Sequence, residues 1–473
     1  MPKEGPMLNF NVEAKTDYHF VACTQEEAKQ VGKGFEGELD EILFVPSLDE
    51  TTASRVYIGL GAKANITKRS VRNAYAKAWH GIRKSEKIAI TIERHGFHAL
   101  GLDYYENAVQ GILLASYTFE GYKTEQKPCK VSIHVQSYDE KETLALQQME
   151  NLVMGVNQAR DLIAQPPNKL FPKELARWVS DYGQAYGYRV KCYGKEELET
   201  MGLHAFLSVA QGSKREPRLV VMEYMPVKNQ NPIGLVGKAL TCDTGGYCLK
   251  SASSMPYIKG DMAGAANVIG LMNAIARNKC QINVVAVIAV CENILDGNSF
   301  IPGDVITSLA NKTIEVVNTD AEGRLTLADA LTYIQGNYRL DAVVDIATLT
   351  GATATCFGSL YTPVFGNKQE LVQEFIQSGE TVGEDFWQLP LDDRYKEQIL
   401  SPIADLKNGG KPSTIAAAMF LQEFIQQTPW LHIDIAATAI QYPIVDAYSK
   451  DVASGIGIFS LYHWLNKRRL YYA

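Results

Sequence analysis

One stretch of the chain, "NTDAEGRLTLADA" (318–330), places two acids and an arginine at two-residue spacing: Asp320, Glu322 and Arg324. It follows the strand-like run "TIEVVN" and precedes an amphipathic run, so we expect an extended connection in which the three side chains share one face and Gly323 lets the backbone turn. Two carboxylates on one side suit a hard divalent cation, and the arginine suits a bound anion. The alternative is a surface loop whose arginine neutralises the acids, or acids that cap the next helix.

Two further stretches carry charged residues of the same kind. "VGKALTCDTGGYCLK" (236–250) holds Lys238, Asp243 and Lys250 around a Gly-Gly turn, and "IKGDMAGAANV" (258–268) puts Asp261 at the start of a helix rich in small residues. A phosphate-binding loop of the GxxxxGK[ST] type is excluded, because that spacing is absent. Taken alone, the Gly-Gly stretch at 236–250 could be a plain loop, and Asp261 could simply cap its helix.

The elements that must position these residues are aliphatic runs alternating with helical patterns. The runs lie at 218–224, 233–240, 282–290, 342–349 and 431–436. Because continuous rather than alternating runs indicate strands covered on both faces, we predict an α/β fold with a mostly parallel central sheet flanked by helices. Ligands bind at the carboxyl ends of the strands in such sheets, and the acidic stretches fall there.

The domain organisation follows from the length of the chain and from one helix. A chain of 473 residues favours two domains. We predict a small N-terminal α/β domain over 1–140, with its clearest helix at "SVRNAYAKAWHGIRKS" (70–85), and a larger domain over 168–473 that holds the three charged stretches. Between them, 141–167 is predicted as a linker helix that Pro166 and Pro167 terminate.

Composition excludes several classes of protein. The net charge of −7 argues against nucleic acid as the main partner. The longest aliphatic run, from Val284, is too short to span a bilayer, which argues against a membrane protein. The start of the chain shows no apolar signal segment, and the eight cysteines are scattered, so we expect a cytoplasmic protein with reduced thiols.

Together the three stretches resemble the leucyl aminopeptidase (cytosol aminopeptidase) family of dimetal exopeptidases. "NTDAEGR" followed by "LADAL" looks like the family signature, while "GK", the aspartate five residues after that lysine, "GG" and the second lysine match at the family spacing. "KGDMAGAA" resembles the family's helix start. The resemblance covers about 151–465. Ala239 and Ala263 replace glycines that are common in the family, but no ligand or catalytic group is lost.

The resemblance implies two divalent metal ions, Mn²⁺ or Zn²⁺ and possibly Mg²⁺. Asp243 and Glu322 would bridge them, Lys238 and Asp261 would complete the tighter site, and Asp320 the more labile one. Bridging carboxylates are what a two-metal centre needs. Lys238 can be a ligand only as a neutral amine, so the metal must depress its pKa.

The resemblance also implies the catalytic groups and the substrate. Lys250 would polarise the scissile carbonyl and stabilise the oxyanion, and Arg324 would hold a bicarbonate ion that acts as general base. The substrates would be short peptides with a free N-terminus, cleaved after leucine, methionine or another apolar first residue. The family also implies a homohexamer.

The walls of the pocket for the first side chain are also inferred from the resemblance. Its candidate residues are Ile258, Thr348, Gly351 and Ala453. His432 and Asp434, in a strand similar to one of the family, are predicted to be structural, and Cys242 and Cys248 to be packing residues.

Two other classes of function remain open at this point. One is a catalytically weak or regulatory protein on the same scaffold, perhaps binding nucleic acid. Loss of Lys250, Arg324 or a ligand would favour it, and all are present. The other is a phosphatase or nuclease with a two-metal core, which predicts acids without two lysines at the metal site and leaves "NTDAEGR" unexplained.

Overall fold

The computed structural model describes residues 8–11, 15–32, 34–49, 52–82, 87–119, 121–125, 130–441, 443–450 and 452–469. The chain forms two compact units. The N-terminal unit comprises Pro2–Asn157 and Ile444–Val452, and the larger unit comprises Gln158–Pro443 and Ala453–Ala473. The boundaries predicted at 140 and 167 are not decided by this division and stay a prediction.

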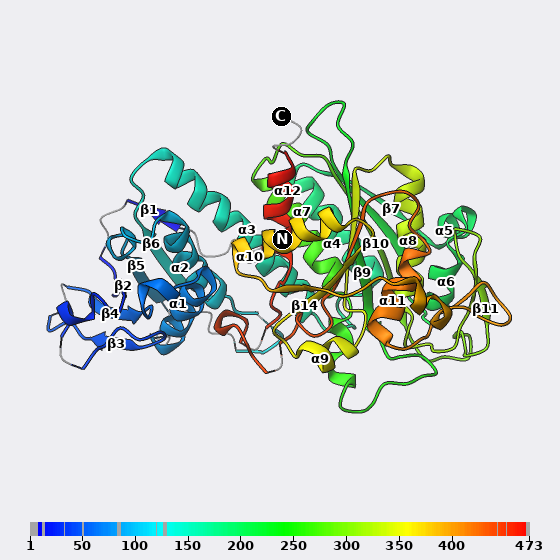
Figure 1. The fold of residues 1–473 in the computed structure, drawn as a ribbon, viewed down its shortest axis with the longest axis horizontal. Coiled ribbons are helices and arrows are strands. Elements are labelled where there is room, and N and C mark those ends of the chain that lie inside the picture. The colour runs from blue at the N-terminus through cyan, green and yellow to red at the C-terminus, as the bar shows by residue number, and fades with distance from the viewer. Residues whose placement is uncertain are drawn as a thin grey trace. The chain divides into compact units, whose positions relative to one another are not determined.

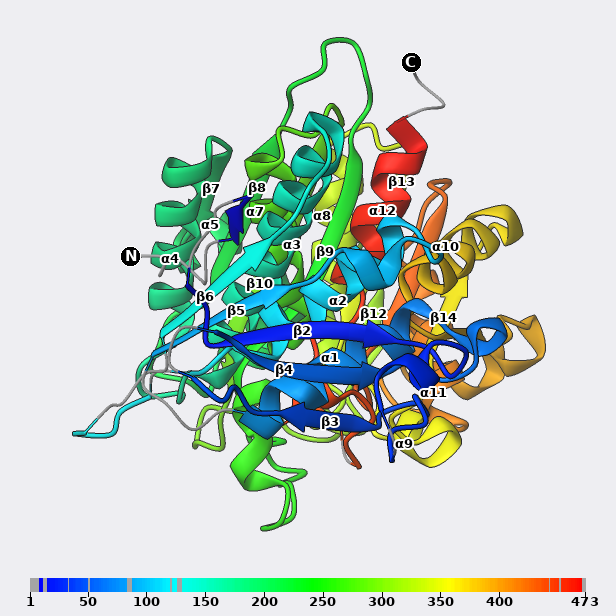
Figure 2. The same cartoon turned by 90° about the vertical axis from the view of Figure 1, so that its left-hand side faces the viewer.

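The N-terminal unit is built on a six-stranded sheet, whose strands lie side by side in Figure 2. In spatial order they are β1 (Leu8–Phe10), β6 (Lys130–Val135), β5 (Lys87–Ile92), β2 (Tyr18–Cys23), β4 (Ser54–Gly59) and β3 (Ile42–Val45). Its helical elements are η1 (Ala28–Gln30), η2 (Lys63–Asn65), α1 (Lys68–Ile82), η3 (His95–Phe97), α2 (Leu102–Ala115) and η6 (Ala447–Ser449). Strand β5 alternates between buried and more exposed side chains, so one face of this sheet is more deeply covered than the other.

A segment from late in the chain belongs to the N-terminal unit. Within residues 444–452, the buried carboxylate of Asp446 accepts hydrogen bonds from Arg69 Nε at 2.8 Å and from Asn73 Nδ2 at 3.0 Å. Both donors lie on α1. These bonds to a buried charge explain why the segment groups with this unit, and no sequence pattern had indicated it.

Helix α3 (Glu140–Ala164) contains the boundary between the two units, after Asn157. It ends before Pro166 and Pro167, as predicted from the effect of proline on the preceding residue.

The larger unit is built on an eight-stranded sheet (Figure 1). In spatial order its strands are β15 (Phe386–Gln388), β14 (Thr362–Gly366), β17 (Trp430–Asp434), β13 (Ala342–Ala347), β9 (Ile233–Asp243), β10 (Val284–Asn293), β8 (Arg218–Tyr224) and β7 (Arg189–Tyr193). The four central strands, β17, β13, β9 and β10, are parallel, and antiparallel pairs occur toward both edges. Every residue of β9, β10, β13 and β17 is buried, which confirms the prediction of an α/β fold with a mostly parallel central sheet covered on both faces.

Helices cover both faces of this sheet. They are α4 (Pro172–Tyr186), α5 (Lys195–Met201), α6 (His204–Ala210), η4 (Met255–Gly260), α7 (Ala263–Arg277), α8 (Gly323–Asn337), α9 (Ala352–Phe357), α10 (Gln369–Val382), η5 (Asp393–Gln398), α11 (Ser413–Gln422) and α12 (Ile458–Arg469). A side chain at Gly237 would meet Ala265 of α7, and one at Gly234 would meet Ile334 of α8. Since residues 234 and 237 point to opposite faces of β9, α7 and α8 pack on opposite faces of the sheet.

A small three-stranded sheet lies beside the main one: β11 (Val305–Thr307), β12 (Thr313–Glu315) and β16 (Leu406–Lys407). The run "TIEVVN", predicted as the strand before the acidic stretch, contributes only β12 and belongs to this sheet. None of the helices among the described residues combines the length and apolar character that a membrane crossing requires.

Candidate metal centre

Four polar residues mark the carboxyl ends of the four central parallel strands. Asp243 ends β9, Asn293 ends β10, Asp434 ends β17, and Thr348 directly follows β13. Parallel strands end at the same edge of a sheet, so the topology brings these side chains to one place. The predicted site residues gather around this edge.

Lys238 lies on β9 with its ammonium group buried among acids. Its Nζ is 2.8 Å from Asp261 Oδ2 and 2.9 Å from Glu322 Oε1, and it donates a hydrogen bond to the carbonyl oxygen of Thr348 at 2.9 Å. Neither carboxylate oxygen receives a hydrogen bond of normal geometry, so these contacts are ion pairs that leave lone pairs unsatisfied. The fold therefore brings one lysine amine and two carboxylates, all groups that can bind a metal ion, into one small volume.

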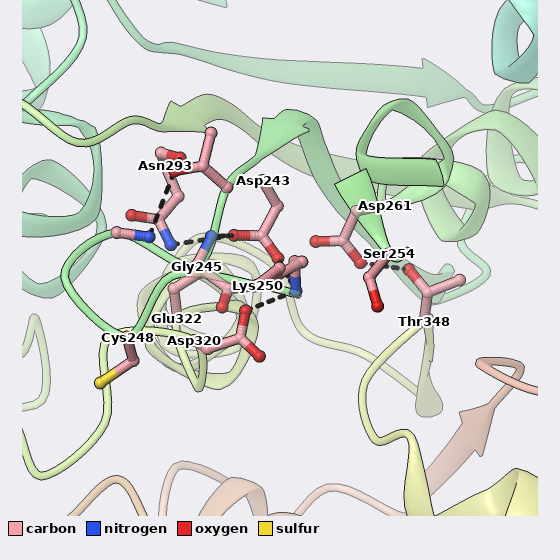
Figure 3. A network of polar contacts seen from close by, with 12 residues as sticks. Asp243, Gly245, Cys248, Lys250, Ser254, Asp261, Asn293, Asp320, Glu322 and Thr348 are labelled. Atoms are coloured by element: carbon pink, nitrogen blue, oxygen red, sulfur yellow. Dashed lines mark hydrogen bonds and ion pairs between the residues drawn. The ribbon is translucent and has the colours of Figure 1, made fainter. Parts of the chain in front are cut away.

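The Gly-Gly turn brings Lys250 back to the same acids. Its Nζ lies 2.6 Å from Asp243 Oδ2 and also pairs with Asp320 Oδ1 (Figure 3). The turn needs glycine because Gly245 and Gly246 have φ of 85° and 59°, and because a side chain at Gly245 would lie 2.8 Å from Asp320 Oδ1. The plain-loop alternative does not account for this close approach.

The acidic stretch is not extended throughout, and this part of the prediction was wrong. Asp320 lies in a turn, but Glu322 has helical dihedrals as the residue before α8, and Arg324 lies in the first turn of that helix. The two acids nevertheless converge, because ligand oxygens of Asp243, Asp320 and Glu322 all lie within 4.8 Å of one another. A turn that enters a helix brings the acids together as well as a strand would.

The need for glycine at position 323 also differs from the expected backbone turn. Its φ is not left-handed, but a side chain there would lie 2.4 Å from Lys238 Cε and 2.7 Å from Nζ. Glycine at this position therefore makes room for the lysine between β9 and α8.

Asp261 does not cap the helix that follows it. Helix α7 begins at Ala263 without a side-chain cap, whereas Asp261 accepts a hydrogen bond from Thr348 Oγ1 at 2.8 Å and pairs with Lys238 (Figure 3). Its carboxylate points to the acid cluster and not to the helix end.

The electrostatics show a cluster with too little positive charge. Burial and, after it, the charge of Asp243 raise the pKa of the Glu322 carboxyl to about 8, against the lowering effect of Lys238. Burial raises the pKa of Asp261 to about 6 and that of Asp320 above its usual range. Four acids face two lysines and the buried guanidinium of Arg324 at this site, so the acids outnumber the cationic side chains and the cluster favours binding further cations.

The pKa values of the two lysines are raised as well, but here by the neighbouring acids and against the effect of burial. Burial lowers the pKa of the Lys238 amine, but Asp261 and Glu322 outweigh it and raise the pKa overall. The same balance, dominated by Asp243 among the charges, raises the pKa of Lys250. Lys238 can thus act as a metal ligand only after losing a proton, which a nearby divalent cation favours.

Arg324 is buried beneath the cluster. Its Nε and Nη1 have no hydrogen-bond partner among the described residues, and burial lowers the pKa of its guanidinium to about 10, although Glu322 and Asp434 act to raise it. Unpaired buried donors are costly, so this guanidinium is suited to an anion that supplies acceptors.

The donor set fits a pair of hard divalent cations. Glu322 Oε1 and Oε2 and Asp261 Oδ2 are buried without a hydrogen-bond partner among the described residues, and carboxylate oxygens are the ligands that such cations prefer. Burial raises the pKa of the Cys242 thiol to about 11, which disfavours the thiolate that a soft metal would need.

Comparison with known proteins agrees with this geometry. The chain matches the cytosol aminopeptidase family, catalytic domain, over residues 157–462 and the N-terminal domain of the same family over 20–126. The chain belongs to the cytosol aminopeptidase family. Similar relatives are named probable cytosol aminopeptidases: that of Clostridium perfringens is 39% identical over 93% of this chain and 91% of its own, and that of Clostridium tetani 40% over 91% and 90%.

A solved structure shows the same architecture. The bottromycin maturation enzyme BotP, in a complex with Mn, superimposes with a TM-score of 0.87 at 28% identity, covering 96% of this chain and 99% of that one. Membership of the family supports metal-dependent aminopeptidase activity for this chain, as the sequence resemblance had implied.

The predicted pocket residues are placed less clearly. Thr348 contacts Lys238 and Asp261 directly, but the described contacts do not join the other three to the acid cluster. Ile258 is half-buried in η4, Gly351 is exposed just before α9, and the carbonyl of Ala453 accepts a hydrogen bond from Arg160. The pocket therefore stays a prediction.

Sequence reasoning missed Asn293, which supports the cluster. It is fully buried, and its amide donates to Asp243 Oδ1 at 2.9 Å and to the carbonyl of Thr319 at 3.0 Å. The signal was present, because Asn293 ends the strand beside the one that Asp243 ends.

His432 and Asp434 occupy buried positions on β17. His432 Nδ1 lies 2.6 Å from Asp345 Oδ1, and Trp430 Nε1 donates to the other oxygen of the same carboxylate. Asp434 accepts hydrogen bonds from the loop after β13. The structural role predicted for both residues stays a prediction.

Proposed function

We propose that this protein removes an N-terminal leucine, methionine or other apolar residue from short peptides, using two divalent cations and a bicarbonate ion. The observation that carries this proposal is the buried cluster of acids and lysines at the carboxyl edge of the central sheet, in which Asp243, Asp320 and Glu322 can ligate one ion together. Family membership supports aminopeptidase activity. The preference for an apolar first residue and the use of bicarbonate as general base are part of the proposal.

The chain's residues divide naturally between two metal positions. Lys238 contacts both Asp261 and Glu322, and these three residues with Asp243 would hold the tighter ion. Asp320 lies on the other side with Asp243 and Glu322 and would complete the more labile one (Figure 3). Two such ions supply Lewis-acid activation of water and of the scissile carbonyl. The manganese complex of BotP favours Mn²⁺ over Mg²⁺, with Zn²⁺ as the other candidate.

Lys250 and Arg324 would be the catalytic groups. The Lys250 ammonium lies at the exposed side of the cluster beside Asp243 and Asp320, where it can donate to the substrate's carbonyl oxygen and stabilise the oxyanion. The unpartnered guanidinium nitrogens of Arg324 would hold the bicarbonate, which acts as general base in place of a protein carboxylate.

Specificity for a free N-terminus follows from the same groups. The Asp261 carboxylate can hydrogen-bond the substrate's α-amine, whereas an acetylated terminus has lost its basic lone pair and adds bulk. An apolar pocket would reject aspartate or glutamate at the first position, because burying an unpaired carboxylate costs several kcal/mol.

A paired assay tests the proposal. We expect cleavage of leucyl-glycyl-glycine but not of its N-acetyl form, loss of activity after extensive chelation, and recovery with Mn²⁺ or Zn²⁺. Full activity of a verified metal-free sample would refute the dimetal mechanism. Equal cleavage of the two peptides would refute the role of the free amine, and a preference for acidic first residues would overturn only the pocket.

The remaining expectations belong to this proposal as well. A homohexamer, a cytoplasmic location and the absence of a nucleic-acid partner rest on resemblance and composition. Binding of nucleic acid without peptidase activity would favour the regulatory alternative.

A further inference from the structure

Thr348 makes contact with both residues that distinguish the tighter metal position from the other one. Its side-chain Oγ1 donates to Asp261 Oδ1 at 2.8 Å, and its backbone carbonyl accepts from Lys238 Nζ at 2.9 Å. We propose that Thr348 is a positioning residue for these two ligands, and that its main role is not to form a wall of the substrate pocket. This inference rests on the proposed dimetal site.

The two hydrogen bonds act on different atoms and have different consequences. A hydroxyl has one hydrogen to donate, and Thr348 gives it to Oδ1, which fixes the carboxylate plane and leaves Oδ2 directed at Lys238, 2.8 Å away. Without this donor the Asp261 side chain could rotate, and its free oxygen would no longer be held toward the cluster.

The carbonyl of Thr348 orients the amine. A neutral Lys238 has two hydrogens and one lone pair, and the carbonyl engages one of those hydrogens. Because the substituents of an sp³ nitrogen point apart, this bond turns the lone pair away from Thr348 and toward the acids. The same bond already holds the protonated side chain in place, so less of its conformational freedom is lost when a cation replaces a proton on Nζ.

The loop that carries Thr348 is itself held in place by Asp434. This buried carboxylate accepts hydrogen bonds from Leu349 N at 3.1 Å and from Thr350 Oγ1 at 2.7 Å. Asp434 pairs in register with Ala347, the residue before Thr348. Asp434, which anchors the loop, therefore lies in the sheet, and Thr348, which bonds to Asp261 and Lys238, lies in the loop. The geometry of the metal position is thus set by neighbouring strands.

The test is metal affinity, measured separately from activity. We would prepare metal-free wild type and the variants Thr348→Val and Thr348→Ser, and titrate each with Mn²⁺ and with Zn²⁺ against a competing chelator. Valine keeps the shape and the carbonyl but loses the hydroxyl, and serine keeps the hydroxyl. Thr332→Val, which loses a hydroxyl bond within α8, is the matched control.

We expect Thr348→Val to lower the affinity for the more tightly bound ion by about 10–100-fold, as is usual when a residue that orients metal ligands is lost. The affinities of Thr348→Ser and Thr332→Val should stay close to that of wild type. The Thr350 side chain donates to Asp434 and has no hydrogen bond to a proposed ligand among the described residues. Thr350→Val should therefore lower the affinity for the same ion by a smaller factor. It provides the test if Thr348→Val does not fold.

The opposite results are equally clear. Unchanged metal affinity in Thr348→Val, with a change only in KM or in the preferred first residue, would show that Thr348 is a pocket wall and overturn the inference. Failure of wild type itself to bind two ions would instead overturn the proposed function, and this inference with it.

Discussion

Replacing Gly323 by alanine adds one methyl group at the point where α8 meets the metal-site lysine. The added Cβ would lie 2.4 Å from Lys238 Cε, 2.7 Å from its Nζ and 2.8 Å from its Cδ. Carbon atoms in contact normally lie about 3.5–4.0 Å apart, so the lysine must move by roughly 1 Å. Lys238 is only 4% exposed and its amine is held by Asp261, Glu322 and Thr348, so it cannot move without losing those contacts.

The effect on stability should be small compared with the effect on function. Alanine is favoured over glycine within a helix by about 1 kcal/mol, and crowding a packed site costs about 1–3 kcal/mol, so the net loss of stability is roughly 0–2 kcal/mol. A misplacement of about 1 Å at a reacting centre can lower the rate by about 100-fold. We therefore expect a folded variant with weakened metal affinity and about 100-fold lower kcat/KM.

The assay compares three proteins: wild type, Gly323→Ala and Gly336→Ala. Gly336 lies in the same helix and has open space around it, so its replacement measures the helix effect alone. Thermal unfolding, metal titration and turnover of leucine p-nitroanilide would be measured on each. Wild-type metal affinity and turnover in Gly323→Ala would refute the claim that glycine is there to make room for Lys238.

Three further predictions test other parts of the structure. Lys250→Ala should lower kcat by about 100–1,000-fold while metal content stays near wild type, and Arg324→Ala should cost less. Elemental analysis showing an empty metal site in Lys250→Ala would mean that Lys250 is a ligand. Burial raises the pKa of Glu106 from 4.5 to about 7 with help from Asp103, so the folded state binds this proton more tightly and wild type loses stability as the pH rises between these values. Glu106→Gln should thus gain in melting temperature relative to wild type between pH 5 and pH 8, and an unchanged difference would contradict the shift. Light scattering should give a hexamer of the 52.3 kDa chain, and a fully active monomer would exclude it.

Local pattern was sufficient for five of the eight strands of the central sheet. Continuous aliphatic runs predicted β8, β9, β10, β13 and β17, because burial on both faces of a parallel sheet leaves no polar alternation. The charged residues of three separate stretches, which the sequence had joined through their resemblance to a family signature, lie together in the structure, and their roles stay a prediction.

The conformation of the acidic stretch could not be predicted from spacing. Two-residue spacing puts side chains on one face only in an extended chain, and the helix begins at Gly323 instead. The convergence of Asp320 and Glu322 with Asp243 depends on where α8 packs against β9, which is a property of the whole sheet.

The supporting residues were decided by tertiary structure alone. Thr348, Asn293 and Asp434 lie far from their partners in the chain, and each is an ordinary residue by type. Thr348 and Asn293 meet the ligands, and Asp434 meets the loop that carries Thr348, only because four parallel strands end at one edge, so that hydrogen bonds run between neighbouring strand ends. Sequence determined which groups can do the chemistry, and the order of strands in the sheet determined which groups hold them in place.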